Sequence, residues 1–192
     1  MAIGLADGSA LVMGGNSSEA INLPDSSSTQ RFDPTTEAFT AGPMLALSAL
    51  DREFTVPVPL RAGAFLLVGG GINSGTVLGT HPAALSQRFD PVRAEFVRSG
   101  DLKRVRSGDA AATLLADGRV LAVGGTRGGA QARSGVSATE LFDARAGKWT
   151  AGPVLDPAWV GVTSTLLGNG KVLLFGGEDA QGFPRPEVFL FE

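Results

Sequence analysis

Few residues in this chain could do catalytic chemistry. It contains one histidine, His81, which precedes Pro82, and no cysteine or tyrosine. A metal-binding histidine needs partner ligands, and no second histidine or cysteine exists to join it. A serine–histidine–aspartate triad would have to use His81, but no serine lies in a Gly-x-Ser-x-Gly motif. We therefore expect a non-enzymatic protein with no metal and no cofactor.

The loop carboxylates are the other candidates for acid–base work. Glu19, Asp25, Glu178 and Asp179 could pair as acid and base, but carboxylates in polar loops are usually just solvated. The net charge of −3 gives no overall attraction to nucleic acid. The sequence also has no apolar run of membrane-spanning length, so we expect no membrane insertion.

The elements that must position these groups come from a repeat. The segment LADGRVLAVGG, residues 115–125, has three further copies in the same frame, which start at Leu5, Leu60 and Leu167. Each copy is a turn glycine, a short apolar run and a pair of glycines. A repeat of about 50 residues that contains strands is typical of a β-propeller built blade by blade.

The glycine pairs are expected to close these strands, where φ > 0 and close backbone approach are needed. No Gly-x-Gly-x-x-Gly and no Lys-Ser pair follows them, so the pattern favours a structural role over phosphate binding. The eight glycines are Gly14, Gly15, Gly69, Gly70, Gly124, Gly125, Gly176 and Gly177.

The apolar runs are hydrophobic on both faces of the strand. Val120 and Ala122 point to one side, whereas Leu121 and Val123 point to the other. A sheet with one wet face would alternate polar and apolar residues, and these strands do not. The pattern predicts sheets that are stacked face against face around a shared axis.

A second frame follows a variable polar loop in each repeat. Residues 30–45 align with residues 87–102 and 140–155 without a gap, and each segment reads as strand, turn, strand. Asp33, Asp90 and Asp143 begin the turns, which indicates structural rather than catalytic aspartates. A later aromatic position is expected to be buried between neighbouring sheets, and is occupied by Phe39, Phe96 and Trp149.

The fourth repeat stops early, because residues 187–192 supply its third strand and nothing supplies a fourth. We therefore expect one domain over residues 1–192 with strand counts of four, four, four and three. Its blades would span 1–45, 46–102, 103–155 and, incompletely, 156–192. The first strand of blade one is already in place, so an arc is expected, completed by the remaining blades of a longer chain or by a self-association partner.

The turn glycine, Gly-Gly pair, Phe-Asp-Pro turn and spaced aromatic together resemble the kelch repeat across essentially the whole chain. The resemblance implies an all-β fold, namely a partial kelch-type β-propeller of about four blades. These would be four-stranded antiparallel sheets, the last blade incomplete and the ring not closed. The family includes copper-radical oxidases similar to galactose oxidase. Their chemistry needs a tyrosine cross-linked to a cysteine, and this chain has neither.

The resemblance also implies a binding face, because a fixed frame that carries variable loops is the usual arrangement for recognition. Arg52 and Trp159 stand eleven residues before the turn glycines Gly63 and Gly170, where kelch repeats often carry an arginine. A tryptophan there could stack on a sugar. The residues expected on this face are Asn16, Arg52, His81, Arg106, Arg127 and Trp159.

We thus expect a non-catalytic module that holds a protein or a glycan. One alternative is a sugar-directed enzyme, such as a mutarotase or epimerase similar to the sialic acid mutarotase, that uses Arg106 and Arg127. Another is a structural fragment of a longer multi-blade protein. The cysteine-free composition, rich in Gly, Ala and Arg, resembles that of bacterial surface or exported kelch proteins.

Overall fold

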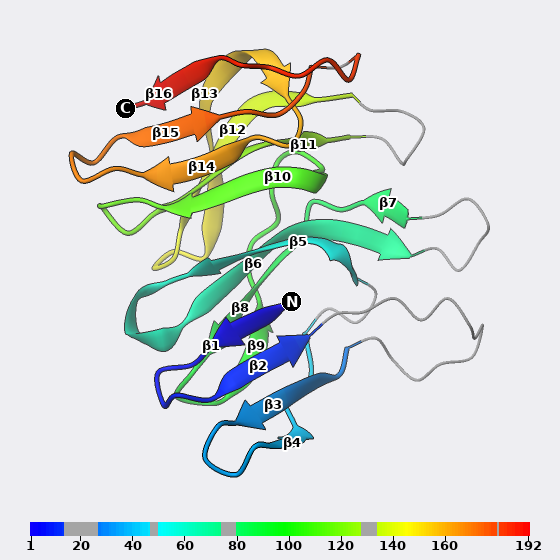
Figure 1. Ribbon diagram of the computed structural model, residues 1–192, viewed down its shortest axis with the longest axis vertical. Helices are drawn as coiled ribbons and strands as arrows, with labels where there is room; N and C mark the ends of the chain where they lie inside the picture. The colour runs from blue at the N-terminus through cyan, green and yellow to red at the C-terminus, as the bar shows by residue number, and fades with distance from the viewer. Residues whose placement is uncertain (14–26, 47–49, 74–79, 128–133, 180) are drawn as a thin grey trace.

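The computed structural model describes residues 1–13, 27–46, 50–73, 80–127, 134–179 and 181–192 (Figure 1). Within these ranges the chain is all-β, apart from the short 3-10 turn η1 (Arg61–Gly63). None of these residues belongs to a helix that is long and apolar enough to cross a membrane. The strands are β1 (Ala2–Gly4), β2 (Ala10–Met13), β3 (Thr29–Asp33), β4 (Ala38–Ala41), β5 (Leu50–Pro59), β6 (Phe65–Asn73), β7 (Thr80–Pro82), β8 (Ser86–Asp90), β9 (Glu95–Arg98), β10 (Ser107–Leu114), β11 (Val120–Thr126), β12 (Val136–Asp143), β13 (Lys148–Trp159), β14 (Thr163–Leu166), β15 (Val172–Phe175) and β16 (Val188–Phe191).

These strands form four separate antiparallel sheets of three to five strands. We name them the first (β1–β4), second (β5–β9), third (β10–β13) and fourth (β14–β16) sheets. Strands adjacent in sequence pair antiparallel in each sheet, except that β6 pairs with both β7 and β8, and the sheets follow one another in chain order along the molecule (Figure 1). The fourth sheet has three strands, as expected. The architecture is consistent with part of a β-propeller.

The second sheet corrects the expected count of four strands, because β7 adds a fifth. β6 does not end at Gly69-Gly70 but continues to Asn73, and this extension pairs with β7 through Ile72 and His81. His81 was expected in a loop and lies instead at the centre of β7. β11 likewise runs through Gly124-Gly125, whereas β15 ends at Phe175, just before its glycine pair. Gly14 and Gly15 lie outside the described residues.

The glycines are needed where the chain crosses from one sheet to the next. Gly69 and Gly124 have φ of 69° and 67°, in the left-handed region that side chains disfavour. A Cβ on Gly69 would lie 2.7 Å from the carbonyl oxygen of Arg106, and a Cβ on Gly124 would lie 2.9 Å from that of Trp159. The connecting segment into each following sheet therefore rests directly on a bare glycine.

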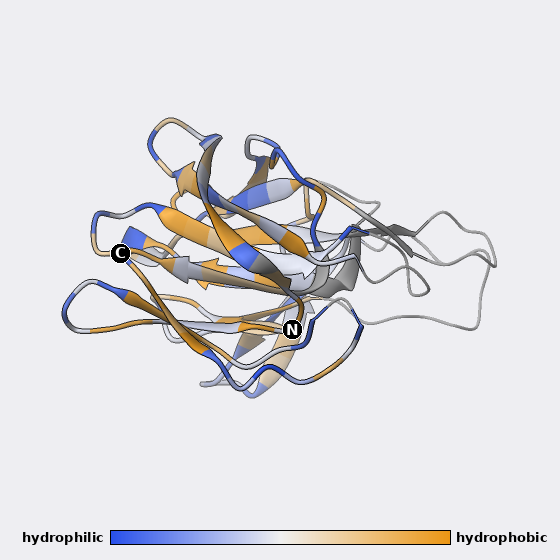
Figure 2. Ribbon diagram, turned by 90° about the horizontal axis from the view of Figure 1, so that it is seen from above, coloured by the Kyte–Doolittle hydropathy of each residue, from blue (hydrophilic) through white to orange (hydrophobic). Residues whose placement is uncertain are grey.

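The core consists of three layers, one between each pair of neighbouring sheets. In β11, Val120 and Ala122 pack toward the second sheet, whereas Leu121 and Val123 pack toward the fourth. In Figure 2 the strands carry most of the hydrophobic colour, and the turns carry much of the hydrophilic colour. Burial on both faces, as the apolar runs predict, is thus found in the two middle sheets. In each layer one equivalent leucine is also buried: Leu45 and Leu102 in the connectors after β4 and β9, and Leu155 within β13.

The aromatic position after each aspartate turn is buried in two of its three copies. In the first layer, the ring of Phe96 packs edge-on against Phe65 and at a tilt against Phe89. Trp149 is buried in the second layer, and its Nε1 donates a hydrogen bond across the sheets to Ser86 Oγ at 3.0 Å. Phe39, which was also expected to be buried, is 57% exposed. It pairs with Phe32 on the face of the first sheet that has no neighbouring sheet in the structure.

The turn aspartates serve the backbone, as their sequence context indicates. Asp143 Oδ1 accepts hydrogen bonds from the N–H groups of Arg145 and Ala146, at 2.8 and 3.0 Å. Asp90 Oδ1 makes the equivalent pair with Val92 and Arg93. These N–H groups hold the pKa of both carboxyls below its ordinary value, because they favour the charged form.

Candidate binding site

The binding residues were expected at the edge of the sheets where the β2–β3, β6–β7, β11–β12 and β15–β16 connections leave. We call this edge the loop rim; it lies on the right of Figure 1. Arg127 is exposed there at the end of β11, where its N–H donates to the carbonyl of Ser134 at 2.9 Å. Asn16 lies outside the described residues. Arg52 lies in β5 and His81 in β7, and for these two residues the structure describes the backbone only.

Arg106 lies in the connector before β10, and its side chain is completely buried. Its Nη1 donates to the carbonyl of Gly124 at 2.7 Å, and its Nη2 donates to the carbonyl of Ala138. Nε and Nη2 both bond Glu140 Oε1, at 3.3 and 3.2 Å. Burial lowers the pKa of the guanidinium, and the Glu140 charge opposes that shift. Arg106 thus acts inside the third sheet, with no surface left for a ligand.

Trp159 ends β13, and it is also buried. Its ring packs edge-on against Phe189, with centroids 6.3 Å apart, and belongs to the layer between the third and fourth sheets. Its Nε1 is buried without a hydrogen-bond partner in the described part of the chain. Sugar stacking needs an open aromatic face. The burial of this ring therefore supports a packing role.

The loop rim does carry one exposed aromatic, which is Phe183. It lies in the β15–β16 connection, and its side chain is 68% exposed. The Asp179 carboxylate fixes the loop, because its Oδ1 accepts hydrogen bonds from the N–H groups of Gln181 at 2.9 Å and Phe183 at 3.0 Å. The base of the loop is tied to the segment between β13 and β14, because Val160 and Glu178 exchange backbone hydrogen bonds of 3.1 and 2.7 Å. Phe183 is therefore presented to solvent on a braced loop.

Sequence reasoning missed Phe183, although a signal was present. The rim loops span 16–28, 71–86, 126–138 and 178–187, and Phe183 is the only Phe, Trp or Tyr among their residues. A single aromatic before a proline in a polar loop has no core to enter. We therefore expect it to face solvent or a partner.

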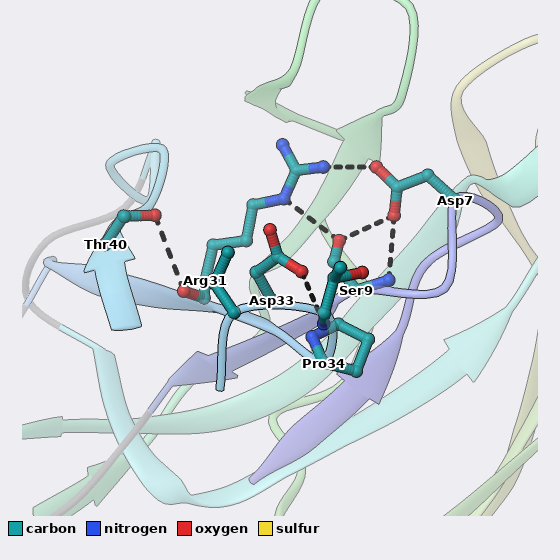
Figure 3. Close-up of a pocket in the computed structure, with 8 residues that line it drawn as sticks. Asp7, Ser9, Arg31, Asp33, Pro34 and Thr40 are labelled. Carbon is teal, nitrogen blue, oxygen red and sulfur yellow. Dashed lines mark hydrogen bonds and ion pairs between the residues drawn. The ribbon is translucent and has the colours of Figure 1, made fainter. Parts of the chain in front are cut away.

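A second candidate lies at the opposite edge, where the turns of the first sheet meet (Figure 3). This surface pocket of about 500 Å³ is lined by Asp7, Ser9, Arg31, Asp33, Pro34, Thr35, Thr36 and Thr40. Arg31 Nε donates to Ser9 Oγ at 2.9 Å, and its Nη2 pairs with Asp7 Oδ2. The Ser9 hydroxyl donates to Asp7 Oδ1 at 2.6 Å and, as the largest cause, lowers the pKa of that carboxyl.

The pocket combines hydroxyl groups with a guanidinium that is already neutralised by Asp7. Such a lining suits a polar, uncharged ligand better than a phosphate, which would need unpaired positive charge. Its second carboxylate, Asp33, accepts the Thr35 N–H at 2.8 Å and so braces its own turn. No set of three or more His, Cys, Asp or Glu side chains in the described ranges is placed to hold a metal ion.

Comparison with known proteins gives the fold and nothing finer. No family model matches the sequence, and no curated protein matches it. Among solved structures, that of YjhT is similar, with a TM-score of 0.69 and 16% sequence identity. The match covers 98% of this chain and 64% of the YjhT chain, so this chain spans less than two thirds of that protein. At this identity the likeness establishes a shared all-β fold and carries no activity with it.

Proposed function

We propose that this chain is part of a kelch-type β-propeller and acts as a non-catalytic recognition module that holds a protein or a glycan at its loop rim. The observation that carries the proposal is Phe183. A large aromatic side chain, 68% exposed on a loop braced by Asp179, has the form of a binding anchor. Aromatic residues contribute much of the binding energy at protein interfaces, and their faces also stack on sugar rings.

The neighbouring groups fit recognition of a polar partner. Asp179 fixes the loop before any ligand arrives, so little ordering cost is left for the binding step. Arg127 adds an exposed guanidinium at the same rim, on the third sheet. The rim thus offers an apolar anchor on one sheet and a charged donor on the next.

The sugar-directed enzyme is less well supported. That alternative needs Arg106 to reach a substrate, and its guanidinium is fully buried against Glu140 and two carbonyl groups. Loss of activity on substitution of Arg106 would therefore report unfolding as readily as catalysis.

The proposal is tested with the purified chain on a glycan array and, in parallel, by affinity capture of proteins. The discriminating variant is Phe183→Ala. Because Phe183 is mostly exposed, this variant should keep the melting temperature of the wild type. We expect it to raise the Kd of any ligand found at least tenfold, which corresponds to a loss of about 1.4 kcal/mol in binding free energy.

The matched control is Val92→Ala, which removes an exposed apolar side chain from the β8–β9 turn at the opposite edge. Binding should be unchanged in this variant. A ligand that Phe183→Ala and Val92→Ala bind equally well would show that the loop rim is not the site. If binding is lost instead on Arg31→Ala, the turn pocket of Figure 3 is the site.

A further inference from the structure

The two outermost sheets each present a largely apolar face that none of the described residues covers. On the fourth sheet the register pairs Leu173 with Leu190 and Phe175 with Val188, so these four side chains share one face. Phe175, Val188 and Leu190 are among the exposed large hydrophobic residues. On the first sheet, Phe32 and Phe39 pair on the outward face, next to Ala10.

These exposed positions have buried equivalents in the middle sheets. Leu173 and Phe175 align with Leu121 and Val123, which are buried against the fourth sheet. Phe32 and Phe39 occupy the positions of Phe142 and Trp149, which are buried against the second sheet. The two end faces therefore carry the two complementary halves of the contact that joins neighbouring sheets within the chain.

We propose that these faces bind each other between two copies of this chain, head to tail. The outward face of the fourth sheet in one copy would pack on the outward face of the first sheet in the next. The contact would continue the packing already seen between the first and second sheets, where Leu11 and Met13 meet Phe89 and Phe96. The two faces differ, so the contact is heterologous: the copies form a ring if the rotation closes and a filament if it does not.

The length of the structural neighbour agrees with this arrangement. The chain matches 64% of YjhT, so that fold extends beyond the portion this chain supplies. A second copy would supply further sheets of the same kind. The end faces also lack charged side chains among their paired positions, which are Ala2, Gly4, Ala10, Val12, Gln30, Phe32, Phe39 and Ala41 on the first sheet and Thr163, Thr165, Leu173, Phe175, Val188 and Leu190 on the fourth. Apolar complementarity therefore favours a like partner over a charged one.

Sedimentation velocity of the purified chain over a range of concentrations tests the proposal. We expect a species of at least twice the 19.6 kDa of one chain. Val188→Asp and Phe39→Asp should each reduce assembly, and circular dichroism should show that both variants remain folded. The matched control is Val154→Asp, because Val154 lies in β13 and is 69% exposed, against 58% for Val188. A wild-type chain that stays monomeric throughout overturns the proposal.

Mixing the two variants separates a head-to-tail contact from a symmetric one. Each variant keeps one intact face, so a one-to-one mixture should recover a dimer through the Val188 face of one copy and the Phe39 face of the other. Failure to recover it would refute the head-to-tail arrangement, and undiminished assembly of either variant alone would show that like faces pair. A second readout uses the absence of cysteine: Phe39→Cys mixed with Phe175→Cys should form a mixed disulfide faster than either variant alone.

These outcomes are independent of the loop rim. Phe183→Ala should leave the mass of the assembly unchanged, because Phe183 lies on the connection and not on either end face.

Discussion

In the third and fourth sheets, one buried side chain at an equivalent position anchors the segment that leads into the sheet. The side chain is charged in the third sheet and aromatic in the fourth. Four residues after a buried leucine, the connector into the third sheet carries Arg106, whereas the end of β13, which leads into the fourth sheet, carries Trp159. Their partners are also equivalent, because Glu140 pairs opposite Ala122 and Phe189 pairs opposite Leu174 in the same register. A buried ion pair in one sheet is thus replaced by an aromatic pair in the next.

The backbone explains why the two solutions are not interchangeable. Glu140 accepts hydrogen bonds from the N–H groups of Lys103 and Arg104 as well as from Arg106. The residue of β13 that corresponds to Arg104 is Pro157, which has no N–H to satisfy. An apolar Phe189 therefore leaves fewer buried donors unpaired than it would in the third sheet. In the second sheet Gln87 takes an intermediate role, because its Oε1 accepts the Ala46 N–H at 3.0 Å.

The largest expected effect comes from removing the buried ion pair between Arg106 and Glu140. Glu140→Ala leaves the Arg106 guanidinium buried without its carboxylate, and it also frees two backbone N–H groups. We expect a loss of about 3–5 kcal/mol in the free energy of unfolding, measured by urea denaturation. Glu187→Ala, at an exposed glutamate, is the control and should change stability by less than about 0.5 kcal/mol. A loss below about 1 kcal/mol for Glu140→Ala would mean that the ion pair does not secure the connector.

Removing the aromatic contact between Trp159 and Phe189 should lower the free energy of unfolding by less. Phe189 is 43% exposed, so its truncation removes less buried surface than truncation of a fully buried phenylalanine. We expect Phe189→Ala to lower the free energy of unfolding by about 1–2 kcal/mol, against about 3–5 kcal/mol for a core phenylalanine. Phe142→Ala, at a completely buried site in the third sheet, supplies that reference under the same denaturant protocol. Equal losses at the two positions would show that the fourth sheet is held as tightly as the third.

The equivalence of Arg106 and Trp159 also shows where sequence reasoning stops. The glycine frame and the doubly apolar runs predict the stacked sheets, because side-chain alternation and burial are local properties. Counting back from the turn glycines aligns Trp159 with Arg52, but it places Arg106 one residue away from the equivalent position. A β-bulge between Ser107 and Ala110 adds a residue to the third sheet, and bulges are invisible in the sequence pattern. The strand β7 was missed for a related reason, because Pro82 makes its segment read as a loop.

The candidate site was predicted less well than the fold. Exposure depends on which sheets are present as neighbours, which no single repeat encodes. Phe39 and Phe96 have the same sequence context, yet only Phe96 is covered. Arg106 reads as a rim residue until Glu140 is brought next to it, from 34 positions away along the chain.

A smaller contrast between equivalent positions lies in the turns between the last two strands of a sheet. Gly147 in the third sheet has φ of 64°, and Ala94 adopts φ of 52° at the same position in the second sheet. Ala94→Gly should relieve the left-handed conformation and raise the free energy of unfolding by up to about 1 kcal/mol. Gly147→Ala should lower it by about 1 kcal/mol, because a Cβ there meets nothing within 4 Å and the cost is conformational only. Thermal unfolding of both variants checks the opposite signs, and a shift in the same direction for both would contradict the strain argument.

The smallest expected effect is electrostatic and compares Asp143 with Glu192, which follow the equivalent residues Phe142 and Phe191. The pKa of each carboxyl lies below its ordinary value. For Asp143 the chief causes are the N–H groups of Ala146 and Arg145; for Glu192 they are the hydrogen bond and charge of Lys171. A lowered pKa in the folded state contributes stability above the unfolded pKa, and this contribution is lost as the pH falls through the folded pKa. Asp143→Asn should therefore reduce stability at neutral pH, and its difference from the wild type should shrink in acid below the ordinary pKa of 3.8.

Salt screens an exposed ion pair more than it weakens a backbone hydrogen bond. In an NMR titration at about 1 M salt, the Glu192 pKa should move up toward 4.5 while that of Asp143 stays low. Equal movement of both would show that charge, and not the turn backbone, sets the Asp143 pKa.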